Sequence, residues 1–209
     1  MIKNDSTRDF LKRWIIFALF LLLPCLFACA GTPPPRFYVL SAGVDSQIKS
    51  SEGLSVGVGP IKIPDYLDRL QLVTRSNVNT LVLADFDRWG EPLQSGFPRV
   101  LSENLGKLLD TESVAVYPWP SSNKMDYQVT VEVVRFDGAM GGDVVLEARW
   151  ALTSESGKRL HVREISTVSE PVKENSYEAL VAAQSRALAG LSRKIAAAVL
   201  EAWTTGHTQ

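Results

Sequence analysis

Histidine and cysteine are scarce in this chain, and their scarcity limits the chemistry that its side chains can perform. Two of the 209 residues are histidines, His161 and His207, and two are cysteines, Cys25 and Cys29. The sequence has no spacing typical of a metal site, such as HExxH. Beyond Cys29 there is no thiol for a disulfide bond or for nucleophilic catalysis. We therefore expect no metal, no cofactor and no cysteine-dependent reaction.

The chain also has no excess of one charge. It holds 22 lysines and arginines against 23 aspartates and glutamates. Without the four basic and two acidic residues of positions 1–28, 18 basic and 21 acidic residues remain, which gives a net charge of −3. A nucleic-acid-binding domain normally presents a strongly basic surface. We therefore expect no nucleic-acid partner.

Only one long apolar run is present, and it lies near the N-terminus. Residues 14–28, WIIFALFLLLPCLFA, carry no charge and follow four basic residues within positions 1–13. A transmembrane helix needs about 20 apolar residues, and this shorter run is interrupted by Pro24. The pattern favours a signal peptide over a transmembrane anchor, which is the alternative interpretation.

The end of this run predicts lipidation. The residues Leu26-Phe27-Ala28-Cys29 resemble a bacterial lipobox, in which a small residue directly precedes the cysteine. Cys25 follows Pro24 instead, so we expect it to leave with the leader. We predict that residues 1–28 are a lipoprotein signal peptide and that Cys29 carries fatty acyl chains such as palmitate. A plain, cleaved secretory signal is the alternative.

The residues after Cys29 predict where the domain is held. Ala30 is not the aspartate typical of inner-membrane retention, which favours the periplasmic face of the outer membrane. Residues 29–36 form a short tether that includes three consecutive prolines, which favour stiff polyproline II. The seven residues from Ala30 to Arg36 span at most about 25 Å. The folded domain should therefore stay close to the membrane.

Hydrophobic periodicity in the rest of the chain predicts an α/β fold of the α+β type. We expect a single domain at residues 37–203 and a polar tail at 204–209. A turn or short helix is expected at 63–69, and helices at 92–109 and from an Asn175 N-cap to about 203. Strands are expected at 38–40, 54–58, 70–75, 80–86, 114–116, 127–133, 144–152 and 159–168. One apolar face per strand indicates a mixed, mostly antiparallel sheet with helices packed on one face.

One literal catalytic motif occurs in the chain. Residues 53–57 spell G-x-S-x-G around Ser55, the pattern of a nucleophile elbow. Such an elbow needs a helix directly after the serine, and Pro60 and Pro64 disfavour one. His161 alternates within a predicted strand and is expected to face solvent, as are the loop carboxylates Asp65, Asp68, Asp85 and Asp87. A periplasmic hydrolase is thus a disfavoured alternative.

Two tryptophans lie in predicted loops beside prolines. Trp89 belongs to RWGEPL at 88–93, and Trp119 belongs to YPWP at 117–120. Aromatic side chains in loops can anchor a protein interface. The alternative is that each covers one end of the hydrophobic core, because large aromatic residues are mostly buried.

The order of these segments resembles the ABC-type transport auxiliary lipoproteins, the PqiC-like family, over essentially the whole mature chain. The most specific segments are IPDYLDR at 63–69 and RWGEPL. With Trp119, the residues Tyr66, Arg69 and Trp89 from these segments are our candidate partner interface. The full series is a lipobox, FYVL at 37–40, VGVGPIKIPDYLDRLQLVTR at 56–75, LADFDRWGEPL at 83–93, RVLSENLGKLL at 99–109, YQVTVEVVRFDG at 127–138 and a long final helix.

The resemblance implies a non-catalytic lipoprotein that works with an MCE-domain membrane protein in lipid transport between the inner and outer membranes. The chain would be the outer-membrane docking component, bound to the membrane through Cys29. Self-association into a homo-oligomer is compatible with the sequence. A lipoprotein that assists another envelope assembly, such as lipopolysaccharide export or secretion, is the second interpretation.

Overall fold

The computed structural model describes residues 10–14, 17, 32–44, 53–120, 123–154 and 158–207. The chain divides into two compact units, Met1–Pro34 and Pro35–Gln209. In the first unit, residues 10–14 are helical, whereas Cys25, Cys29 and the predicted cleavage point lie outside the described residues. Within the described part of the chain, no helix has the length and apolar character needed to cross a membrane.

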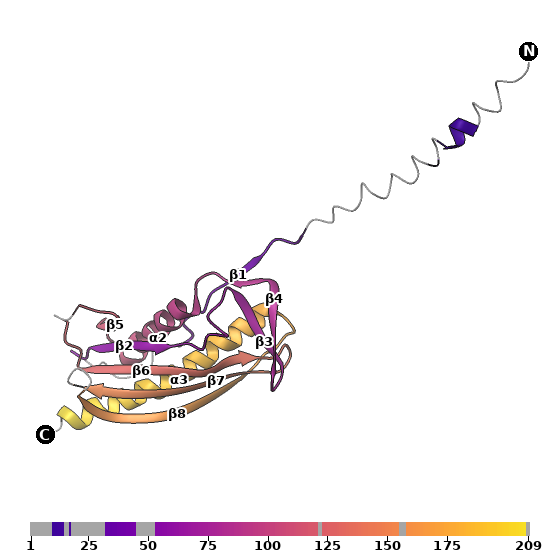
Figure 1. Ribbon diagram of the computed structural model, residues 1–209. Helices are drawn as coiled ribbons and strands as arrows, with labels where there is room; N and C mark the ends of the chain where they lie inside the picture. The colour runs from indigo at the N-terminus through magenta and orange to yellow at the C-terminus, as the bar shows by residue number, and fades with distance from the viewer. Residues whose placement is uncertain are drawn as a thin grey trace, which may run out of the picture. The chain divides into compact units, whose positions relative to one another are not determined.

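Five strands of the second unit form one sheet in the order β5-β2-β6-β7-β8 (Figure 1). Strands β6, β7 and β8 form an antiparallel meander, as the sequence predicts, while β2 runs parallel to both β5 and β6. The strand bounds are Val56–Lys62 for β2, Val114–Val116 for β5, Tyr127–Gly138 for β6, Asp143–Ser154 for β7 and Arg159–Pro171 for β8.

The remaining three strands form a separate, smaller sheet. Its order is β1-β4-β3, with β1 at Arg36–Tyr38, β3 at Gln71–Asn77 and β4 at Thr80–Trp89. The predicted hairpin between β3 and β4 is confirmed, and β1 lies parallel to β4. The fold class is therefore confirmed as mixed and mostly antiparallel, but the strands are divided between two sheets.

Two helices pack against each other and against the five-stranded sheet (Figure 1). Helix α2, Leu93–Leu109, covers β2 and β5, and helix α3, Tyr177–His207, covers β6, β7 and β8. Phe97 of α2 meets Phe136 of β6 edge to face, with 5.6 Å between ring centroids. The alternating strands thus bury their apolar side chains under the helices, as the sequence predicts.

The start and end of α3 differ from the prediction. The backbone N–H of Ala179 donates to Ser176 Oγ at 3.1 Å, so Ser176 caps the helix and the predicted Asn175 cap is wrong. Helix α3 also continues to His207, so the predicted polar tail begins inside the helix. A helix of 31 residues is about 46 Å long.

Strand β2 passes through Pro60, where the sequence predicts that it stops. Pro60 is exposed, and the register between β2 and β6 shifts between Val58 and Ile61. Gly59 has φ +122, a backbone conformation that favours glycine. This local irregularity lets the strand continue past a residue that has no N–H to donate.

A second irregularity lies in β6, where the register with β7 shifts between Val133 and Arg135. Up to Val133 the odd-numbered side chains of β6 face the helices. Beyond the shift Phe136 enters the core, so Arg135 and Asp137 lie on the face of the sheet opposite to the helices.

The long helix defines two ends of this domain. Figure 1 shows β1, β3 and β4 at one end of the five-stranded sheet, which we call the tether end. At the other end, which we call the far end, lie β5 and the last turns of α3. Gly206 of α3 and Tyr127, the first residue of β6, line the same far-end cavity. The predicted anchor at Cys29 would join the domain at the tether end only.

Candidate anchor and partner surfaces

Asp87 of β4 fastens the first strand after the tether. Its side chain is buried, and its two carboxylate oxygens accept hydrogen bonds from Arg36 Nη2 at 3.0 Å and Tyr38 OH at 2.7 Å. Burial and the bond to Asp87 together raise the pKa of Tyr38 to about 12. The prediction that Asp87 is a solvated loop charge is wrong, because β4 continues beyond Phe86 and carries Asp87 into the protein.

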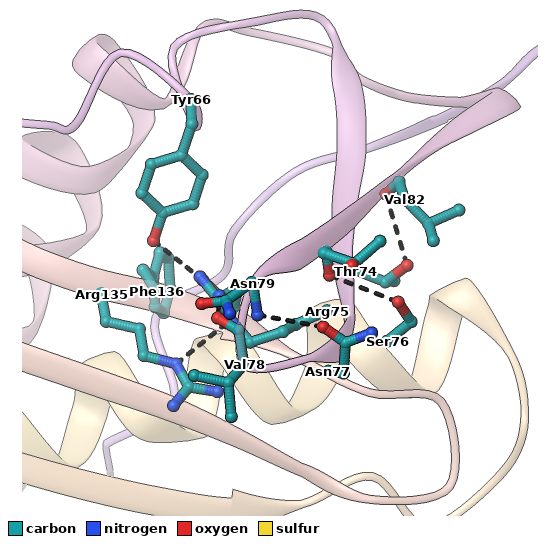
Figure 2. A network of polar contacts seen from close by, with 12 residues as sticks. Tyr66, Thr74, Arg75, Ser76, Asn77, Val78, Asn79, Val82, Arg135 and Phe136 are labelled. Carbon is teal, nitrogen blue, oxygen red and sulfur yellow. Dashed lines mark hydrogen bonds and ion pairs between the residues drawn. The ribbon is translucent and has the colours of Figure 1, made fainter.

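Asp137 of β6 is the centre of a second buried cluster. Arg75 Nε and Nη2 lie 2.7 and 2.8 Å from its two oxygens, Arg135 Nε lies at 2.9 Å, and Tyr66 OH donates at 2.8 Å. Figure 2 shows Tyr66, Arg75 and Arg135 converging from the 63–69 turn, β3 and β6. The cluster ties the small sheet to the outer face of the large one.

The groups of this cluster hold one another in their ordinary charge states. Burial by itself would raise the pKa of Asp137, but hydrogen bonds from Arg75, Tyr66 and Arg135 outweigh it and the pKa lies below its ordinary value. Burial, with the bond to Asp137, raises the pKa of Tyr66 to about 12. The carboxylate therefore stays ionised and the phenol stays protonated, which is a structural arrangement and not a poised acid–base pair.

The predicted interface residues fall in different places. Trp89 is 3% exposed and lies in the core, so its interface prediction is wrong and its alternative, a core position, is correct. Tyr66 is half-buried in the Asp137 cluster. Arg69 is half-buried, and its Nε is buried without a hydrogen-bond partner. The structure therefore does not bring Tyr66, Arg69, Trp89 and Trp119 together as one surface.

Trp119 lies at the far end of the domain, over Gly57 of β2. A β-carbon added at Gly57 would meet Trp119 Cη2 at 2.5 Å, so the absence of a side chain there lets the indole lie on the strand. Tyr117 packs against this indole edge to face, with 5.7 Å between ring centroids, and is 54% exposed. The pair is an aromatic surface at the far end, and Tyr117 is its more accessible member.

A cavity of about 720 Å³ also opens at the far end, between the last turns of α3 and the adjoining strand ends. Tyr127, His161 and Trp203 are among its lining residues. His161 is half-buried, stacks edge to face on Tyr127 and shares a 2.8 Å hydrogen bond with Ser154 Oγ. The prediction that His161 simply faces solvent is therefore wrong.

The geometry does not form a hydrolase site around Ser55. Its hydroxyl donates to Asp126 Oδ2 at 2.7 Å and accepts from the Asp126 N–H at 3.0 Å. The partner of His161 is Ser154, and Ser55 is followed by β2 rather than by a helix. Across the described residues, no group of three or more His, Cys, Asp or Glu side chains could hold a metal ion.

Asp137 and Tyr117 are structurally prominent residues that sequence reasoning does not single out, and it assigns Asp87 to solvent. Asp137 lies beyond the strand predicted at 127–133, and only the register shift in β6 places it beside Arg75. A charged residue flanked by strand-forming residues, as in VVRFDG, is the one local signal that could have pointed to it.

The described residues thus provide a first strand fastened at the tether end and an aromatic pair at the far end. The family model for the ABC-type transport auxiliary lipoprotein component matches residues 38–196. The chain belongs to this family, as its segment order predicts.

Individual relatives agree with this family. The chain is similar to the intermembrane transport lipoprotein PqiC of Escherichia coli (strain K12), with 26% identity over 149 residues, 69% of this chain and 76% of the relative. The same values hold for PqiC of Shigella flexneri.

Solved structures show the same fold. The crystal structure of protein XCC0632 from Xanthomonas campestris matches with a TM-score of 0.69 and 16% identity, over 83% of this chain and all of that one. The crystal structure of an uncharacterized protein matches with a TM-score of 0.64 and 21% identity, over 78% and 97% of the two chains.

Proposed function

We propose that this protein is a non-catalytic lipoprotein of the outer membrane that docks an MCE-domain membrane protein of the same intermembrane lipid transport system. In this role it is held at the periplasmic face by acyl chains on Cys29. The observation that carries the proposal is the family match from residue 38 to residue 196, which begins directly after the predicted lipobox and tether. The relatives named as intermembrane transport lipoproteins support the same role.

The tether end supports anchoring. Six residues, Ala30 to Pro35, separate the predicted anchor from β1, so Arg36 lies at most about 25 Å from Cys29. Asp87 binds both Arg36 and Tyr38, so β1 is fixed to the domain from its first residue. The tether is therefore joined directly to a strand that is hydrogen-bonded to the rest of the domain.

The far end supports docking. It lies about 46 Å from the tether end along α3, which is farther than the tether itself can reach. When the tether end faces the outer membrane, a protein that approaches from the inner membrane meets the far end first. Tyr117, which is 54% exposed and packs on the half-buried Trp119, supplies exposed aromatic area of the kind on which protein interfaces are commonly built. We therefore place the MCE-protein contact on this pair.

A pull-down from detergent-solubilised envelopes tests the proposal. The tagged full chain should recover an MCE-domain membrane protein, identified by mass spectrometry. The double variant Tyr117→Ala/Trp119→Ala should recover about tenfold less, as expected when one interface anchor is lost. The control Ile165→Ala removes a side chain that is 61% exposed on β8 and should change nothing. Recovery of only an export or secretion component by the unaltered chain would contradict the proposal.

A further inference from the structure

The tether end exposes apolar side chains next to the place where the chain enters the domain. Phe37, Val39 and Leu70 are 62%, 54% and 54% exposed. Single exposed apolar residues are common on protein surfaces and need no explanation. Phe37 and Val39, however, come from one segment and Leu70 from another, and the backbone of β4 lies between the two segments.

Contacts around the end of β4 show their proximity. Phe37 is the register partner of Arg88 in the parallel β1–β4 pair. A β-carbon at Gly90 would lie 3.2 Å from Val39 Cγ1 and 4.0 Å from Phe37 Cβ, so both side chains border the same glycine. The Trp89 N–H donates to the Leu70 carbonyl at 2.7 Å, which places the 63–70 segment on the other side of β4.

Two arginines, Arg69 and Arg88, adjoin this apolar group. Arg88 pairs with Phe37 in the sheet, and Arg69 directly precedes Leu70. Each has a buried Nε without a hydrogen-bond partner, and neither forms an ion pair with any residue that the structure describes. Their positive charge is therefore available to an anion outside the domain. The five residues Phe37, Val39, Arg69, Leu70 and Arg88 are called here the tether-end patch.

We infer that the tether-end patch is a second membrane contact, which rests on the headgroups of the leaflet that holds the anchor. The inference depends on acylation of Cys29, which belongs to the proposed function. Phe37 is eight residues from Cys29, so the chain can carry it at most about 29 Å from the anchored residue. Apolar side chains bordered by arginines match the boundary between acyl chains and anionic headgroups.

This contact would orient the domain. One acylated residue on a tether leaves the domain free to rotate over the membrane. A second contact beside β1 restricts that rotation and keeps the far end, with Tyr117 and Trp119, directed into the periplasm. The lipid surface is favoured over a protein partner because the short tether confines this patch, and not the far end, to the neighbourhood of the leaflet.

Site-specific fluorescence tests the inference on the full, lipid-modified chain. The processed chain has no cysteine besides Cys29, so a cysteine introduced at Val39 can be labelled selectively with the environment-sensitive dye NBD. The matched control is Ile165→Cys on β8, whose side chain is 61% exposed. Both proteins are incorporated into vesicles of phosphatidylethanolamine and phosphatidylglycerol that contain brominated lipids, and flotation measures how much protein is bound.

The expected result is that both proteins float with the vesicles and that the label at 39 is quenched several-fold more strongly than the label at 165. Arg69→Gln/Arg88→Gln should reduce quenching at 39 only when phosphatidylglycerol is present. Protein that floats without preferential quenching at 39 would overturn the membrane contact and leave the anchor intact. Protein that does not float would overturn acylation, and the contact with it. If brominated lipid does not quench the NBD label at 39 but solubilised envelope proteins change its fluorescence, the patch is a protein interface instead.

Discussion

Arg75 and Asp137 form a bidentate ion pair between elements that are 62 positions apart in the chain. Arg75 Nε lies 2.7 Å from Asp137 Oδ1 and Arg75 Nη2 lies 2.8 Å from Oδ2. The Asp137 side chain is completely buried, and that of Arg75 is 21% exposed. The pair fixes the β3–β4 hairpin on the large sheet, and the same hairpin carries β1 and the attachment of the tether.

Loss of Arg75 should therefore destabilise the domain. Arg75→Met leaves the buried Asp137 carboxylate with fewer partners, and we expect the free energy of unfolding to fall by about 3 kcal/mol. The control is Arg149→Met, because Arg149 and Glu132 are both 53% exposed and 3.6 Å apart. An exposed pair of this kind contributes at most about 1 kcal/mol. Urea unfolding followed by circular dichroism gives the free energy of unfolding of both variants. Equal losses in Arg75→Met and Arg149→Met would contradict the role assigned to Asp137.

Acid should weaken the same cluster. The folded-state pKa of Asp137 is lowered, so its contribution to stability is present above the ordinary pKa of 3.8 and is lost as the pH falls through the lower folded value. We expect unfolding free energies measured from about pH 5 downward to fall less steeply in Asp137→Asn than in the unaltered protein. Identical slopes would mean that other carboxylates control acid unfolding.

The α3 cap provides a local test of the fold. Ser176→Ala removes the hydroxyl that accepts the Ala179 N–H and should lower the free energy of unfolding by about 1 kcal/mol. Asn175→Ala changes the exposed neighbouring residue and should have almost no effect. Thermal unfolding measures the loss of stability in both variants. A larger loss in Asn175→Ala than in Ser176→Ala would show that Asn175 is the N-cap, as the sequence predicts.

Gly57 controls the position of Trp119. Gly57→Ala places a methyl group where the indole lies, so Trp119 must move and its fluorescence should shift towards that of a solvated indole. Gly43→Ala is a suitable control, because its β-carbon would meet only Ala189 Cβ, at an ordinary 3.9 Å. The Gly57 variant should also lose recovery of the partner in the pull-down. Unchanged recovery despite a shifted fluorescence would remove Trp119 from the docking surface.

The helices and the antiparallel meander could be predicted because their apolar periodicity extends over many residues. Helix α2 ends at Leu109, and the alternation from Tyr127 matches the buried face of β6. Such a pattern shows which side of a helix or strand is buried, and this can be predicted without knowing which distant segment covers it.

The irregular positions could not be predicted in the same way. Whether Asp137 faces the core or the small sheet depends on the register shift between Val133 and Arg135, and whether β2 ends at Pro60 depends on the shift beside it. Trp89 lies beside a glycine and a proline, as loop residues often do, yet β4 extends to it and buries it. In each case the position of the residue depends on contacts with a segment that is distant in the sequence.

In the proposed function, the far end of this lipoprotein holds an MCE-domain protein. In-cell photo-crosslinking tests it most directly, with a photoreactive amino acid in place of Tyr117 and, as a control, in place of Ile165. We predict a crosslink from position 117 to an MCE-domain membrane protein and none from position 165. A crosslink to that protein from position 165 alone, or from position 117 only to an unrelated envelope assembly, would contradict the account.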